Sequence, residues 1–140
     1  MNILVTGANG FLGEWMIKSL MATHHQAIAG VRKLPQLQQD CEYRIIDILL
    51  FKADLSNALT DIDVVIHAAA RLHVMDDKAS DPLTEFRKVN VEGTLNLACQ
   101  AVERGVKRFI FISSIKVNGE GTKIGKPYTE DSKPNPIDPY

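Results

Sequence analysis

The stretch NILVTGANGFLGEWMIKSLM, which starts at residue 2, restricts the fold more than any other part of the chain. Its apolar run at 2–6 predicts a strand, and apolar residues recur at helical spacing over 11–23. Three glycines lie between the two at even spacing: Gly7, Gly10 and Gly13. A strand, a glycine-rich turn and a helix start can form a phosphate site, because the first helical turn carries unpaired N–H groups and a partial positive charge.

The rest of the chain alternates short apolar runs with helical stretches. The pattern predicts further strands at 26–31, 42–46, 63–69 and 107–114, helices at 55–61 and 82–104, and a turn or short helix at 34–40. Continuous apolar strands separated by helices favour a parallel sheet that is covered on both faces. Right-handed crossovers then give a doubly wound α/β fold. From residue 118 onward glycine and proline dominate, and no period survives.

The composition excludes several classes of protein. With 140 residues, 45% hydrophobic and 24% charged, the chain is typical of one soluble globular domain. A net charge of −1 gives no broad attraction to nucleic acid or anionic membrane. We expect no spanning helix and no secretion signal, because no long apolar run is present. Cys41 and Cys99 form no spaced set, so we expect thiols in a reducing cytoplasm.

The glycine spacing G-x-x-G-x-x-G has two interpretations. A tight strand-to-helix turn without a ligand is the simpler one. The position of the motif, after the first strand and at the start of an amphipathic helix, favours a dinucleotide site. One glycine would make the turn, another would admit the diphosphate, and the third would let the helix pack closely on the strand.

The end of the second predicted strand bears on the identity of that dinucleotide. NAD enzymes usually have an acidic residue there for the ribose hydroxyls. This chain instead has Arg32 and Lys33. A guanidinium fits a 2′-phosphate well, which favours NADP over NAD, while a solvated basic turn is the alternative.

Five motifs follow one another along the chain: VTGANGFLG, DVVIHAAA, NVEGTLNL, FIFISSIKVNG and PYTEDSKPNPIDPY. In this order they resemble the extended short-chain dehydrogenases/reductases, in the branch of nucleotide-sugar epimerases and dehydratases. The resemblance covers the whole chain. It implies a Rossmann-like fold, NAD or NADP as cofactor, a nucleotide-sugar substrate, and a homodimer in the full-length protein.

The resemblance also implies a set of cofactor-binding residues. They are Gly7, Asn9, Gly10, Phe11, Leu12, Gly13, Arg32, Asp47, Ile48, Ala68, Ala69, Ala70 and Asn90. Asp47 and Ile48 resemble an acidic and aliphatic pair that contacts the adenine. Asp54 is a competitor, which we expect to cap the predicted helix at 55–61.

Other interpretations of this set stay open. The small side chains of 68–70 could also serve close packing of a helix. Asn90 would support the strand ends beside the nicotinamide, and a structural bond to backbone is the alternative. Four scattered histidines lack ligand spacing, so we expect no metal site.

Two residues match the catalytic positions of the family. Ser114 matches the catalytic serine or threonine, although it could simply satisfy loop backbone. Tyr140 matches the tyrosine of Y-x-x-x-K, whose phenol has a pKa of about 10; a nearby ammonium and the nicotinamide ring favour the phenolate. That lysine would follow the last residue of this chain.

We therefore expect an N-terminal fragment that is inactive alone. In this interpretation residues 1–117 form the dinucleotide-binding core and 118–140 form the active-site loop. The lysine helix, the last strands and the substrate lobe are absent from the chain.

The resemblance implies an NAD(P)-dependent epimerase or 4-keto reductase of a UDP-sugar-like substrate. AARLHVMDD is similar to bacterial surface-polysaccharide members, while Asn118 replaces the tyrosine of a VYG motif and leaves the sugar open. One alternative, favoured by Arg32, is an NADPH-dependent reductase of a flavonol- or steroid-like carbonyl. Another is a non-catalytic NAD(P)-binding sensor, against which the presence of both Ser114 and Tyr140 argues.

Overall fold

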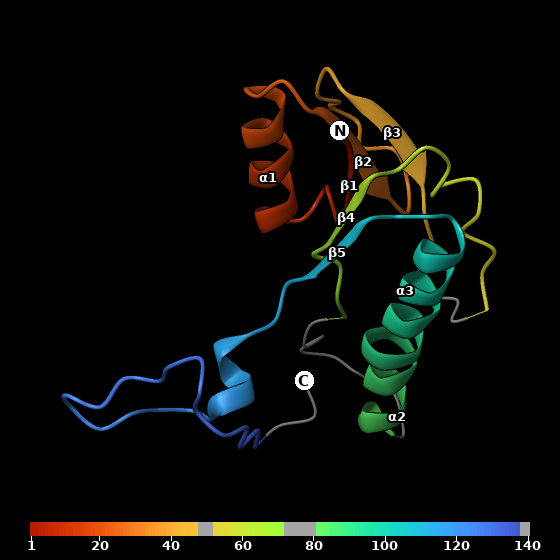
Figure 1. The fold of residues 1–140 in the computed structure, drawn as a ribbon. Helices are drawn as coiled ribbons and strands as arrows, with labels where there is room; N and C mark the ends of the chain where they lie inside the picture. Colours follow the sequence, from red (N-terminus) through yellow and green to blue (C-terminus); the bar gives the residue numbers. More distant parts are fainter. Residues whose placement is uncertain (48–51, 72–80, 138–140) are drawn as a thin grey trace.

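The computed structural model describes residues 1–47, 52–71 and 81–137, which form a parallel five-stranded sheet with helices on its two faces (Figure 1). The strands are β1 (Asn2–Thr6), β2 (Gln26–Val31), β3 (Glu42–Ile45), β4 (Val64–His67) and β5 (Arg108–Phe111). Their order across the sheet is β3-β2-β1-β4-β5, and all pairs are parallel. The predicted Rossmann-like, doubly wound α/β fold is confirmed.

The helices are α1 (Phe11–Met21), α2 (Pro82–Phe86), the π-helical turn η1 (Arg87–Gly93), α3 (Thr94–Glu103) and the 3₁₀ turn η2 (Ile115–Asn118). The helix predicted at 82–104 is thus a continuous rod of α2, η1 and α3. Among the described helices none is long and apolar enough to cross a membrane.

The short helix predicted at 55–61 is wrong. This segment forms turns, with a hydrogen bond of 3.1 Å from the Leu59 amide to the Leu55 carbonyl. Asp61 then adopts a left-handed backbone conformation with a φ of 57°. Because that conformation does not continue a right-handed helix, the segment ends before a second turn forms.

The core lies in two layers, one on each face of the sheet. Neighbouring residues of β1 point to opposite faces, so Leu4 and Val5 belong to different layers. The first layer includes Leu4, Ile28, Ile46, Leu55, Leu59, Val65 and Leu97, the last of these from α3. The second includes Val5, Ala27, Ala29, Val31 and Ile17, the last from α1. Nearly continuous apolar strands therefore correctly indicated a sheet with an apolar layer on each face.

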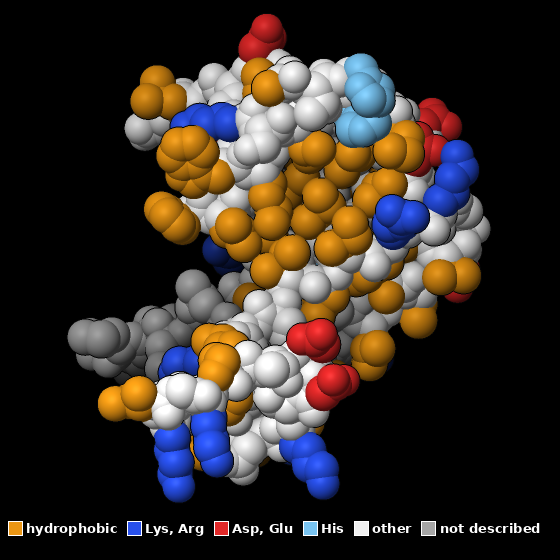
Figure 2. Space-filling view, turned by 60° about the vertical axis from the view of Figure 1, so that its left-hand side comes forward, with side chains coloured by type: hydrophobic (Ala, Val, Ile, Leu, Met, Phe, Trp, Pro, Cys, Tyr) orange, Lys and Arg blue, Asp and Glu red, His pale blue; other side chains and the backbone are white. Residues whose placement is uncertain are grey.

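One part of the sheet remains open. On the face that α1 covers, the register places Ile66 of β4 beside Val5 and Ile110 of β5 beside Ile66. Ile66 is half-buried, and Ile110 is 38% exposed. Figure 2 shows hydrophobic side chains gathered over a broad area of one face of the molecule. Within the described residues, α1 packs on β1 and β2, and no helix covers β4 and β5 on this face.

The strand order determines where a ligand can bind. From β1 the chain crosses to β2 on one side, and β4 and β5 lie on the other. The helices α1 and α3 therefore lie on opposite faces of the sheet, as Figure 1 shows. This arrangement opens a crevice at the carboxyl ends of β1 and β4, the place where doubly wound sheets bind ligands.

Candidate active site

The glycine turn after β1 is held by close backbone contacts. Gly7 has a φ of 70°, and its carbonyl accepts a hydrogen bond of 2.9 Å from the Gly10 amide. A Cβ added to Gly13 would lie 2.2 Å from that same carbonyl oxygen. Gly13 therefore has to lack a side chain for α1 to begin this close to the end of β1.

The first turn of α1 opens onto the crevice. Gly10 precedes the helix and can offer no side-chain cap, and its carbonyl accepts the Glu14 amide at 2.9 Å. The amides of the first turn thus keep their capacity to bind an anion, which the helix dipole also favours. This geometry suits a diphosphate.

A cavity of about 680 Å³ lies at this edge of the sheet. Ligand pockets for small molecules commonly measure about 300–1,000 Å³. Most of the residues predicted for cofactor and substrate line it: Gly7, Asn9, Gly10, Phe11, Leu12, Gly13, Arg32, Ala68, Ala69, Ala70 and Ser114. The fold therefore brings together residues from the glycine turn and from the ends of β2, β4 and β5.

Arginine side chains are present among the described residues that line this cavity. Its described lining carries two charged side chains, Arg32 and Arg71, and no carboxylate. Gly30 and Ile46 complete the wall near Arg32. The Arg32 guanidinium lies at the end of β2, where dinucleotide enzymes contact the adenosine ribose.

Two acidic residues were considered for the adenine site, and their role there stays a prediction. Asp47 is half-buried and follows Ile46, which lines the cavity. Asp54 instead accepts the Ser56 amide at 2.9 Å and caps the turn at 55–61; this bonding to Ser56 lowers the pKa of Asp54. Ile48 lies outside the described residues, so its role stays a prediction.

The Asn90 side chain forms hydrogen bonds with the Arg71 backbone and does not itself line the cavity. It lies in the π-helical turn η1, and such turns are frequent at functional sites. Its Oδ1 accepts the Arg71 amide at 2.7 Å, and its Nδ2 donates to the Arg71 carbonyl at 3.0 Å. Asn90 thereby holds the backbone of a residue that lines the cavity, so the structural bond considered for it is present. Its role beside the nicotinamide stays a prediction.

Ser114 lies after β5 at the mouth of the cavity. Its Oγ accepts the Lys116 amide at 3.2 Å and caps η2. The loop-backbone role considered for this serine is therefore present. Because the hydroxyl acts as an acceptor in that bond, its own proton remains to be donated to another oxygen. Tyr140, the second predicted catalytic residue, lies outside the described residues.

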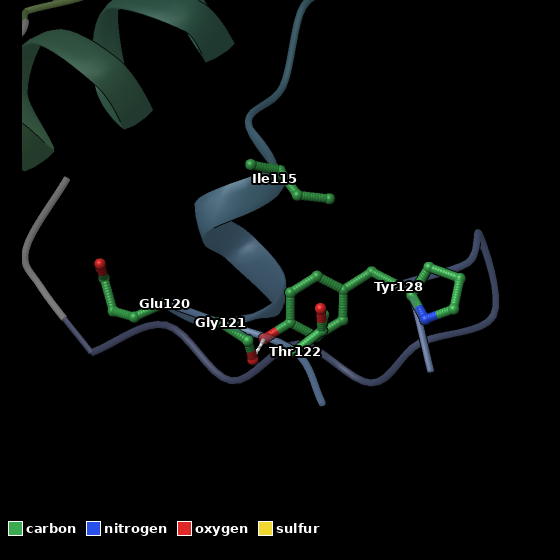
Figure 3. Close-up of a pocket in the computed structure, with 7 residues that line it drawn as sticks. Ile115, Glu120, Gly121, Thr122 and Tyr128 are labelled. Atoms are coloured by element: carbon green, nitrogen blue, oxygen red, sulfur yellow. Dashed lines mark hydrogen bonds between the residues drawn. The ribbon is translucent and has the colours of Figure 1, made fainter. Parts of the chain in front are cut away.

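The segment after η2 folds back on itself. The Tyr128 hydroxyl donates to the Gly121 carbonyl at 2.8 Å, and the Asn135 amide donates to the Val117 carbonyl at 2.8 Å. Figure 3 shows the Tyr128 ring and Ile115 at a shallow hollow, with Glu120 nearby. The predicted active-site loop is thus ordered by its own hydrogen bonds over its described part.

Sequence reasoning missed the role of His67. This residue ends β4 and is 1% exposed, and burial lowers its pKa to about 4. Its Nδ1 lies 2.7 Å from the Thr6 hydroxyl, and its Nε2 lies 3.0 Å from the Thr94 hydroxyl. A histidine inside the apolar run DVVIHAAA was the available signal, because a buried ring needs partners. In the described part of the chain, no group of three or more potential ligands could hold a metal.

Comparison with known proteins identifies the family. A model of the NAD dependent epimerase/dehydratase family matches residues 3–140. This chain belongs to that family. The Rossmann-like sheet and the glycine turn agree with membership of this family.

Individual members of the family give a finer comparison. The chain is 47% identical to UDP-glucose 4-epimerase from Vibrio cholerae, over 99% of this chain and 42% of that protein. The structure of UDP-glucose 4-epimerase from Thermotoga maritima with UDP-glucose matches with a TM-score of 0.81 and 29% identity, over 100% of this chain and 46% of that one. UDP-glucose 4-epimerase from Thermus thermophilus, a complex with NAD, matches with a TM-score of 0.84 and 25% identity, over 100% and 46%. The chain thus spans less than half the length of these relatives.

Proposed function

We propose that this chain forms the cofactor-binding part of an NAD(P)-dependent epimerase or 4-keto reductase that acts on a nucleotide-activated sugar, UDP-sugar-like. One observation carries the proposal. The glycine turn, the α1 N-terminus and Ser114 line a single cavity, in a chain that is 47% identical to a UDP-glucose 4-epimerase.

The residues present fit a dinucleotide. Gly7 to Gly13 and the first turn of α1 would hold the diphosphate, since a side chain at Gly13 would meet the Gly7 carbonyl. The small side chains of 68–70 leave room for the ribose and phosphates. Arg32 would lie at the adenosine ribose and suits a 2′-phosphate.

Held by these residues, the oxidised cofactor would supply the hydride acceptor for oxidation of the sugar carbon that carries the reacting hydroxyl. Tyr140 would take the proton of that hydroxyl, and Ser114 would donate a hydrogen bond to the same oxygen. The products of this half-reaction are a ketone on the sugar and a reduced cofactor. An epimerase returns the hydride to the other face of the ring, whereas a 4-keto reductase runs only the return step.

A second candidate function rests on Arg32. Because Arg32 lines the cavity and the described lining has no carboxylate, an NADPH-dependent reductase of a flavonol- or steroid-like carbonyl would use the same cofactor geometry. Reductase activity consumes NADPH in proportion to product. Epimerase activity leaves the cofactor concentration unchanged, so nicotinamide absorbance separates an epimerase from either reductase. The carbonyl substrate that is consumed, a keto-sugar or a flavonol- or steroid-like compound, separates the two reductases.

We also propose a cytoplasmic homodimer for the full-length protein. Apolar side chains follow the outer side of the helical rod: Val91 is 50% exposed, Leu95 is 58% exposed and Val102 is 78% exposed. Such a stripe is typical of a surface that another helix covers. Light scattering on the protein and on its Leu95→Glu variant tests the dimer, and a monomeric wild type would contradict it.

The main experiment uses the longest protein that the reading frame encodes. UDP-sugars are supplied with NAD or NADP, and turnover is compared with that of Ser114→Ala and Tyr140→Phe. Loss of a proton-transfer group should cost roughly 10²- to 10⁴-fold in rate. Ser113→Ala is the matched control, because Ser113 lines the same cavity one residue earlier. Unchanged turnover in Tyr140→Phe would overturn the catalytic role of Tyr140. A wild type that binds NAD or NADP but turns over no sugar would favour the sensor.

A further inference from the structure

His67 is a polar residue inside an apolar layer. It ends β4, is 1% exposed, and its ring centroid lies 5.9 Å from that of Phe109 and 5.9 Å from that of Phe111. A side chain this deeply buried cannot reach a substrate in the cavity. Its effect on the site therefore has to pass through the groups to which it is hydrogen-bonded.

The directions of its hydrogen bonds follow from one carbonyl group. The Thr94 hydroxyl lies 2.9 Å from the Asn90 carbonyl, which can only accept, so the single Thr94 hydroxyl proton is used there. Thr94 Oγ1 must then accept from His67 at 3.0 Å, which places a proton on Nε2. In the neutral ring Nδ1 is left as an acceptor, and it takes the Thr6 hydroxyl proton at 2.7 Å.

Both ends of this chain of hydrogen bonds reach the cavity lining. At one end Thr6 Oγ1 accepts the Ala69 amide at 3.3 Å. At the other end the Asn90 side chain makes two bonds with the Arg71 backbone, at 2.7 and 3.0 Å. Ala69 and Arg71 both line the cavity, so the chain of bonds leaves the lining and returns to it two residues later.

The same bonds hold the glycine turn. Thr6 is the last residue of β1 and directly precedes Gly7. The Cβ position of Gly7 lies 2.9 Å from the Cα and the amide nitrogen of Ala69, so these two backbones touch. A shift of Thr6 relative to Ala69 would therefore change the gap between the turn and the opposite wall of the cavity.

We propose that His67 is a positioning residue, whose neutral imidazole fixes the glycine turn, the 69–71 backbone and the Asn90 turn relative to one another so that the cavity fits a dinucleotide. The inference rests on the proposed dinucleotide binding. His67 supports the cofactor site from behind the lining and takes no part in proton transfer.

Two pairs of variants test the His67–Thr6 and His67–Thr94 hydrogen bonds separately. In His67→Asn the amide oxygen can replace Nδ1 as acceptor from Thr6, and in His67→Gln the amide nitrogen can replace Nε2 as donor to Thr94. Thr94→Val removes the hydroxyl at nearly constant shape, while Thr94→Ser retains it. Leu59→Val is the control, because Leu59 is fully buried in the core layer on the α3 side.

The chain contains one tryptophan, Trp15, which lies on α1 one turn past the start of the helix. Energy transfer from Trp15 to bound NADH or NADPH gives the dissociation constant, and urea unfolding of the same samples gives the stability. We expect His67→Asn, His67→Gln and Thr94→Val to raise the dissociation constant roughly tenfold, as loss of outer hydrogen-bond partners does at metal sites. Thr94→Ser should keep the wild-type dissociation constant, and Leu59→Val should lower the stability without changing that constant.

The outcomes are distinct. Variants of His67 and Thr94 that lose stability but keep the wild-type dissociation constant would show a merely structural histidine and overturn the proposal. Nitrogen NMR of the cofactor-free chain should show the proton of His67 on Nε2, and a proton on Nδ1 would overturn the assigned bonds. A wild-type chain that shows the Nε2 proton but binds neither NADH nor NADPH would instead overturn the proposed function, and with it the positioning of a cofactor.

Discussion

Acid should lower the free energy of unfolding of this chain between pH 6.5 and about 4, chiefly through His67. His67 is 1% exposed, and burial lowers its pKa from 6.5 to about 4. Above pH 6.5 the ring is neutral in both the folded and the unfolded chain. As the pH falls below 6.5, the unfolded chain takes up a proton that the folded chain does not, so the free energy of unfolding decreases.

The size of the effect follows from the two pKa values. Each pH unit between 6.5 and about 4 should remove about 1.4 kcal/mol, which amounts to about 3 kcal/mol over the whole range. Below about pH 4 both states hold the proton, and the His67 contribution stops changing. A loss of this size is a large part of the stability of about 5–15 kcal/mol that native proteins have.

Other groups can be separated from His67 in this range. Hydrogen bonds lower the pKa values of Asp54, Asp63 and Asp81 from 3.8, so their contributions are lost only at still lower pH. Desolvation and the neighbouring His24 lower the pKa of His25, so a His25→Gln variant is needed as a control.

The assay is urea unfolding of the wild type, His67→Gln and His25→Gln at pH values from 7 down to 4.5. A lower stability of His67→Gln at neutral pH does not matter, because the readout is the slope against pH. The wild type and His25→Gln should lose stability steeply, whereas His67→Gln should lose much less. Equal slopes in the wild type and His67→Gln would refute the reasoning that His67 is buried in its neutral form.

Three further predictions concern the turn, the cofactor preference and one ion pair. Gly13→Ala should cost about 1–3 kcal/mol of stability and abolish NADH binding, because its Cβ would lie 2.2 Å from a carbonyl oxygen. Gly121→Ala is the control, because the space around its Cβ is open, and it should change neither quantity. Equal losses in the two variants would contradict this reasoning. Arg32→Glu should weaken NADPH binding at least about tenfold relative to NADH in the Trp15 assay, since charge-assisted hydrogen bonds contribute about 1.5–3 kcal/mol; an unchanged ratio would refute a 2′-phosphate site. The Asp63 carboxylate accepts a hydrogen bond from Lys107 Nζ at 2.7 Å, which lowers the pKa of Asp63. The Asp63→Asn variant should therefore lose less stability than the wild type below pH 3.8. Urea unfolding of both proteins at pH 5 and pH 3 measures the difference.

Local patterns were sufficient for the elements that build the sheet. Most strands are runs of mainly apolar residues, although β3 alternates charged residues with Tyr43 and Ile45. The glycine turn is a local motif whose steric demands can be stated from the sequence. The helix predicted at 82–104 also agrees with the structure, and its side chains Phe86, Leu97 and Ala101 are at most 2% exposed. The segment at 55–61 failed because one left-handed residue, Asp61, ended it, and its helical spacing gave no sign of that.

The contacts behind the cavity depend on information that no local pattern contains. Thr6 and His67 are 61 residues apart and meet because β1 and β4 are adjacent, with Thr6 and His67 in register. Given the doubly wound strand order, polar residues at the ends of these two strands should have been paired with each other. That half of the network could have been predicted once the fold class was known.

The hydrogen bond between His67 and Thr94 could not be predicted in this way, because it depends on the π-helical turn. From Val89 the buried stripe advances by four residues to Gly93, to Leu97 and to Ala101. In an ordinary α-helix each such step drifts by about 40° around the axis. The wide turn η1 offsets part of the drift at the first step, and it sets the rotation at which Thr94 faces His67. A helix assigned from periodicity alone has no wide turn, so Thr94 would be placed at the wrong rotation and the bond to His67 would not be found.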